Sequence, residues 1–147
     1  MQTSQLETAL KIAIAVLIFG MIVLRVFPQW WQLGTEIEGI GYISTSARPW
    51  LDWGISRYGT AGSFFLLSTL WCGWRNSDWV WLHAWVAAFF CVGVFFVDPW
   101  SFAFVDVTPA WGYDAYRIAV AAYCILLAIL SVITLHHVIK DRQSYYD

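Results

Sequence analysis

One stretch decides the fold: residues 55–97 read ISRYGTAGSFFLLSTLWCGWRNSDWVWLHAWVAAFFCVGVFFV. It holds two apolar segments of about 20 residues, each long enough to cross a hydrocarbon layer of roughly 30 Å at about 1.5 Å per helical residue. The polar residues between them, Arg75, Asn76, Ser77 and Asp78, are too few for the chain to cross back. The stretch therefore predicts a transmembrane hairpin of two antiparallel helices.

Tryptophans are expected to mark two membrane surfaces, because an amphipathic indole ring favours the headgroup zone. Five of the eleven surround the polar turn: Trp71, Trp74, Trp79, Trp81 and Trp85. The other six lie in two polar, proline-containing stretches before and after the hairpin: Trp30, Trp31, Trp50, Trp53, Trp100 and Trp111. The two groups predict two aromatic belts on opposite surfaces.

The composition excludes a soluble globular domain. The 147 residues are 60% hydrophobic and only 12% charged, against about 25% charged in soluble domains. A net charge of −2 provides no basic field for nucleic acid. The three cysteines lie within apolar segments and form no close pair, so we expect packing residues rather than a disulfide framework.

Four apolar segments predict an all-α integral membrane protein. We expect a single domain with spans at about residues 9–27, 55–74, 78–97 and 116–139. Residues 29–54 and 100–114 would form two longer loops on the side opposite the termini, the first with a short interfacial helix at residues 49–53. No cleavage site follows the first apolar run, so that run is expected to stay as a span.

Orientation follows from few signals. Lysine and arginine are equally numerous on the two sides, and both lysines, Lys11 and Lys140, lie on the side of the termini. We expect cytoplasmic termini in a bacterial inner membrane or an equivalent energy-transducing membrane.

The three histidines are the candidate cofactor ligands. His83 lies about one turn into the third span, and His136 and His137 lie in the last turn of the fourth, on the same side of the membrane. Facing helices that carry such histidines can hold haem or a chlorophyll or bacteriochlorophyll ring. The alternative is that the histidines hydrogen-bond to headgroups, water or carbonyls near the interface.

Two sets of residues are candidate contacts with partners. The first is a face of small residues on the second span, where another helix could approach closely: Ser56, Gly59, Thr60 and Ser63. Its partner would be span one, span four or another subunit. The second set anchors the stretch DPWSFAFVDVTPAWGYD, residues 98–114, which is too apolar for a solvated coil: Phe102, Phe104 and Trp111. The alternative for these aromatic rings is that they dip into the headgroup layer.

No motif in the chain indicates catalysis. A nucleophile elbow, a phosphate-binding loop and a dinucleotide fingerprint are all missing, and the spans lack the acids that a proton or ion relay needs. The sequence predicts a non-catalytic accessory subunit of a larger energy-transducing membrane complex, photosynthetic or respiratory. It would contact other integral membrane subunits, lipids and pigments such as carotenoid. The alternative function is a haem- or chlorophyll-binding membrane protein that uses His83 with His136 or His137.

Overall fold

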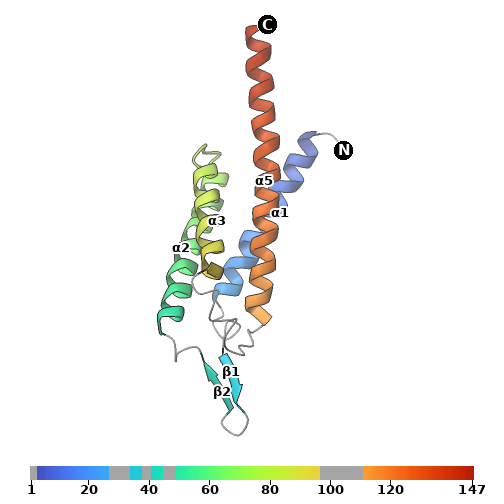
Figure 1. The fold of residues 1–147 in the computed structure, drawn as a ribbon. Helices are drawn as coiled ribbons and strands as arrows, with labels where there is room; N and C mark the ends of the chain where they lie inside the picture. Colours follow the sequence, from blue (N-terminus) through green and yellow to red (C-terminus); the bar gives the residue numbers. More distant parts are fainter. Residues whose placement is uncertain (1–2, 27–33, 38–40, 45–48, 97–110) are drawn as a thin grey trace.

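A computed structural model describes residues 3–26, 34–37, 41–44, 49–96 and 111–147 of the chain. Within these ranges it contains four helices and one pair of strands (Figure 1). In chain order they are α1 (Thr3–Val26), β1 (Gly34–Ile37), β2 (Gly41–Ser44), α2 (Pro49–Trp74), α3 (Val80–Phe96) and α5 (Trp111–Tyr146).

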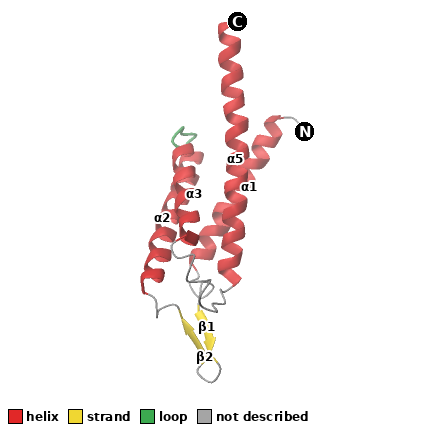
Figure 2. Cartoon of the chain, in the orientation of Figure 1, coloured by secondary structure: helices red, strands yellow, loops and turns green. Residues whose placement is uncertain are grey.

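The helices are arranged as two antiparallel pairs. The α2 and α3 helices form a hairpin, and α1 packs along α5 as the second pair (Figure 2). Both termini and the α2–α3 turn lie at one end of the molecule, and the β-hairpin lies at the other (Figure 1). The end with the termini and the α2–α3 turn is the turn end, and the end with the β-hairpin is the hairpin end.

The turn between α2 and α3 is built from local hydrogen bonds. Asn76 adopts a positive φ of 52°, a conformation that asparagine tolerates better than most residues. The Asn76 N–H donates to the Gly73 carbonyl at 3.2 Å, and the Ser77 N–H donates to the Cys72 carbonyl at 2.9 Å. This is the Schellman arrangement that satisfies the last carbonyls of a helix. Ser77 then caps α3, since its Oγ accepts from the Trp79 N–H at 3.3 Å.

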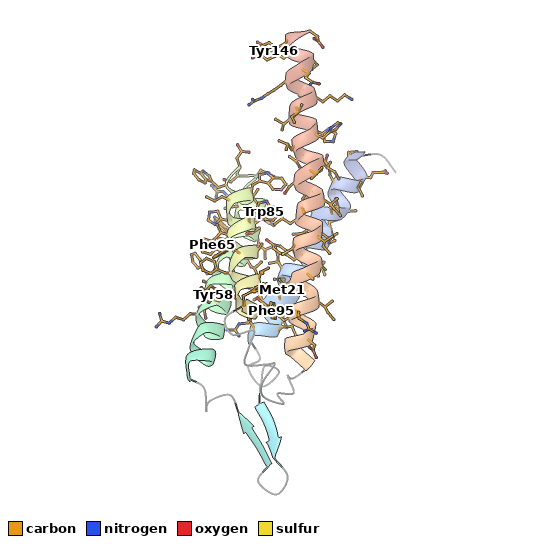
Figure 3. The ribbon with its side chains drawn as sticks, viewed as in Figure 1. Met21, Tyr58, Phe65, Trp85, Phe95 and Tyr146 are labelled. Atoms are coloured by element: carbon orange, nitrogen blue, oxygen red, sulfur yellow. The ribbon has the colours of Figure 1, made fainter. Side chains whose placement is uncertain are left out.

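The core runs along one face of each helix. Small residues of α3 meet large ones of α5: Tyr123 is fully buried and its hydroxyl donates to the Ala84 carbonyl at 2.8 Å. The side chain of Met21 in α1 is also fully buried, and Figure 3 shows it beside α5. The other buried apolar residues are Leu10, Ile14, Ile18, Leu66, Ala87, Ala88, Cys91, Val94, Tyr116, Val120, Leu127 and Leu130.

Glycines allow α2 and α3 to pack closely. A Cβ added at Gly62 would lie 2.8 Å from the Sγ of Cys91, and one added at Gly93 would lie 2.7 Å from Cδ1 of Tyr58. Contacts this short require a hydrogen at both positions. The tight packing makes the α2–α3 hairpin a single structural unit.

The helices differ in extent from the predicted spans. The α2 helix begins at Pro49 and is continuous, so residues 49–53 are its first turns and not a separate interfacial helix. The α5 helix runs from Trp111 to Tyr146, so it begins before and continues beyond the predicted span at about residues 116–139.

The first loop also contains structure that the sequence analysis did not predict. Strands β1 and β2 pair antiparallel, with Gly34 opposite Ser44 and Ile37 opposite Gly41. The all-α prediction therefore describes the helical bundle but omits this β-hairpin.

Among the residues that the structure describes, two helices meet the length and composition expected of membrane spans. They are Ser4–Arg25 within α1 and Asp114–Tyr146 within α5, and Val80–Phe96 is a shorter apolar helix.

Candidate functional site

His83 faces α2. Its Nδ1 lies 2.7 Å from the Ser68 Oγ, and its ring lies 5.9 Å from that of Phe65 between centroids, tilted by 49°. The Ser68 Oγ also donates to the Phe65 carbonyl at 3.0 Å. The histidine is therefore part of a polar contact inside the α2–α3 hairpin.

His137 faces α1. Its Nε2 lies 2.9 Å from the Oε1 of Glu7, and both side chains are partly exposed. The ring of the neighbouring His136 lies 6.2 Å from that of His137 between centroids, and His136 is exposed. His137 thus connects α5 to α1 at the outer end of this helix pair, and His136 lies next to it.

The structure does not bring His83 together with His136 or His137. The bond from Tyr123 to Ala84 places Tyr123 at the level of the residue that follows His83. His136 lies thirteen residues further along α5, about 20 Å at about 1.5 Å per residue. Figure 1 shows this part of α5 rising beyond the α2–α3 turn. In the described part of the chain no group of three His, Cys, Asp or Glu side chains is placed to hold a metal ion.

On the small face of the second span, another helix covers one of the four residues, Gly59. Gly59 is buried under the Arg25 guanidinium of α1: an added Cβ would lie 2.7 Å from Arg25 Cζ. Ser63 is half-buried and donates to the Gly59 carbonyl at 2.9 Å. Thr60 is exposed, and the side chain of Ser56 lies outside the described residues. Of the partners considered for this face, α1 covers Gly59.

The predicted contact surface of the second loop lies outside the described residues. This applies to Phe102 and Phe104, and to the side chain of Trp111, whose backbone begins α5. Their role stays a prediction.

A polar cluster joins all four helices toward the hairpin end. Arg25 of α1 covers Gly59 of α2 and lies near the side chains of Cys91 of α3 and Tyr116 of α5. Cys91 and Tyr116 are fully buried. The cluster ties the two helix pairs together at this level.

At the turn end the two pairs separate and enclose a crevice of about 450 Å³. Its volume falls within the range of about 300–1,000 Å³ that is usual for ligand sites. All four helices contribute to its apolar wall, which includes Ile14, Ile18, Leu70, Ala84, Leu127 and Leu130. The polar residues that line it are Lys11, Thr69, Asn76, Ser77 and Asp78, together with Trp74 and Trp81.

The sequence analysis missed this crevice as a site. Separate signals for the crevice were present in the sequence. Lys11 and the polar turn were both predicted at the same membrane surface, and tryptophans surround the turn. Nothing in the hydropathy pattern shows that the two helix pairs separate there.

Comparison with protein-family models, with curated proteins and with solved structures finds no match to this chain. Functional inference therefore depends on the geometry described above.

Proposed function

We propose that this chain is a four-span integral membrane protein that acts as a non-catalytic accessory subunit of a larger membrane complex. The photosynthetic or respiratory character of that complex is a further prediction. Its support is the aromatic surface, which suits contact with lipid, carotenoid or chlorin rings.

Membrane insertion is supported by the lengths and surfaces of the helices. At about 1.5 Å per residue, α1, α2 and α5 measure about 36, 39 and 54 Å, and α3 about 26 Å, against a hydrocarbon thickness of roughly 30 Å. Large apolar side chains are exposed on every helix, including Phe19, Phe64, Phe89 and Ile125. Such a surface is favourable in contact with lipid and unfavourable in contact with water.

The proposed subunit role rests on the outer face of α5. The face that packs into the bundle holds Tyr116, Val120, Tyr123, Leu127 and Leu130. The opposite face carries a second apolar stripe with alternating steps of three and four residues. Its members, all exposed, are Ile118, Ala121, Ile125, Ala128, Val132, Leu135 and Ile139.

This stripe has the spacing of a helix–helix seam. Steps of three and four residues place side chains for knobs-into-holes packing, with β-branched residues at alternate positions. Ala121 and Ala128 would let a second backbone approach closely, which favours helix association in lipid. Lipid contact alone requires no such repeat. The stripe is the observation that carries the proposal of a partner helix.

Native gel electrophoresis after mild detergent extraction tests this role. We expect the wild-type chain to migrate within a larger complex, and the double substitution Ala121→Phe with Ala128→Phe to release it. The control is Val16→Phe on α1, which adds a ring to another exposed position and should leave the complex intact. Migration of the wild-type chain as a small species of its own would refute the subunit role.

Labelling of single cysteines tests the four spans separately. In a background without the three native cysteines, probes at Asn76 and Ser144 should react from one side of the membrane and a probe at Ser44 from the other. If Asn76 and Ser44 react from the same side, the number of spans is wrong.

A further inference from the structure

The crevice at the turn end combines an apolar interior with a charged rim. Its interior is formed by aliphatic side chains of α1, α2, α3 and α5. The buried Thr69 hydroxyl on this wall donates at 2.7 Å to the carbonyl of Phe65, one turn earlier in its own helix. The interior therefore offers little hydrogen bonding to water, and an apolar chain would fill it favourably.

The rim carries one charge of each sign. Lys11 belongs to α1 and Asp78 to the α2–α3 turn, and both are exposed. Neither forms an ion pair with another residue in the described part of the chain. Asn76 and Ser77 add polar groups beside them. The rim could thus receive an anionic and a cationic group at the same time.

The position of the crevice fits a lipid. Trp74 and Trp81 line it, and Trp74 is 83% exposed, as expected of a ring at the headgroup level. A molecule seated here would have its polar part at the membrane surface and its apolar part between the helix pairs.

We propose that this crevice binds one zwitterionic phospholipid with a primary ammonium headgroup, of the phosphatidylethanolamine class. Its phosphate lies at Lys11, its ammonium lies at Asp78, and one acyl chain enters between the helix pairs. A lipid with only a negative headgroup would gain the Lys11 contact but face repulsion from Asp78. A quaternary ammonium headgroup cannot donate hydrogen bonds to the carboxylate, which makes its contact weaker.

Native mass spectrometry of the delipidated full-length protein tests this assignment by titration with three lipids. We expect one phosphatidylethanolamine per chain, bound about threefold to tenfold more tightly than phosphatidylglycerol or phosphatidylcholine, as one additional charge-assisted contact would give. Glycerophosphoethanolamine, which has no acyl chains, should not compete. Competition by this soluble headgroup would show that the apolar interior is not used and would overturn the proposal.

Two substitutions locate the site. Asp78→Lys, on the exposed turn, should reverse the preference toward phosphatidylglycerol. Ala15→Phe, which fills the crevice from α1, should abolish the bound lipid, while the control Ala9→Phe on an exposed position of the same helix should retain it. Equal binding of the three lipids, or an unchanged preference in Asp78→Lys, would refute the proposed headgroup contacts even if Ala15→Phe fails to fold.

Discussion

Substitution of Gly62 by alanine should destabilise the α2–α3 hairpin because the added methyl group has no room. It would lie 2.8 Å from the Cys91 Sγ and 3.4 Å from the Cys91 backbone nitrogen. An unstrained contact between nonbonded heavy atoms such as carbon needs about 3.5–4.0 Å. Cys91 is fully buried, so its thiol cannot swing into solvent. The two helices must therefore move apart.

The expected cost follows from two opposing effects. Overpacking a closely packed core costs about 1–3 kcal/mol, and replacing a helical glycine by alanine returns about 0.5–1 kcal/mol. We expect the free energy of unfolding to fall by about 1.3 kcal/mol, within a range of about 0–2.5 kcal/mol, which is the overpacking cost less the helix gain. Gly20→Ala is the matched control, since an added Cβ there meets nothing within 4 Å. It should be neutral or slightly stabilising.

Reversible unfolding in mixed detergent micelles, followed by tryptophan fluorescence, measures both values. Cys91→Ala removes the opposing sulfur, so the double variant should recover part of the loss, with a coupling energy of about 1–2 kcal/mol. If Gly62→Ala is no less stable than Gly20→Ala, or if Cys91→Ala does not relieve it, the proposed close contact between α2 and α3 is wrong.

Three other substitutions probe single contacts by the same unfolding measurement. Tyr123→Phe removes the hydrogen bond to the Ala84 carbonyl. The free energy of unfolding should fall by about 0.6 kcal/mol and by less than about 2 kcal/mol, as for other interhelical hydrogen bonds in membranes. A larger loss would mean that the ring packing also changes. Gly93→Ala brings a Cβ to 2.7 Å from Tyr58 and should cost about 0–2.5 kcal/mol, the overpacking cost less the helix gain, a loss that Tyr58→Leu should reduce. His137→Ala removes the contact between its Nε2 and the Glu7 carboxylate and should cost less than about 1 kcal/mol, because both side chains are partly exposed.

The helices and the turn could be predicted because they depend on local sequence. Hydrophobic length is sufficient to locate apolar helices, and serine before an apolar segment is a preferred helix cap. Ser77 caps α3 in this way through its contact with Trp79. The extent of α5 could not be predicted from hydropathy. Hydropathy locates the apolar part of a helix, and a helix can continue into polar residues beyond that part. Lys140, Asp141, Arg142 and Gln143 are compatible with a helix and continue it.

The same limit applies to the histidines. The sequence alone places His136 at the depth of His83 if the fourth helix ends near Ile139. The level of a residue in a bundle depends on how neighbouring helices are shifted along their axes, and one interhelical contact, Tyr123 to Ala84, sets that shift here. Such a contact leaves no mark in the spacing of a single sequence.

The β-hairpin was missed for a different reason. Its four-residue strands are short, and residues such as Glu36, Gly34 and Gly41 are typical of an irregular loop. A weak signal existed, since the residues between the two strands include Gly39, as expected of a short hairpin connection. Only the observed pairing of β1 with β2 distinguishes this segment from an irregular coil.

The pairing of α1 with α5 has a consequence for biogenesis. Helix α1 leaves the ribosome well before its partner α5, and its buried residues Ile14, Ile18 and Met21 pack in a core that α5 helps to form. The α2–α3 hairpin joins residues close in sequence and can form early, whereas closure of the α1–α5 pair involves a long separation and should be slow. A chain released before α5 is complete would leave the α5-facing side of α1 uncovered, and this exposed apolar surface could mark the product for degradation.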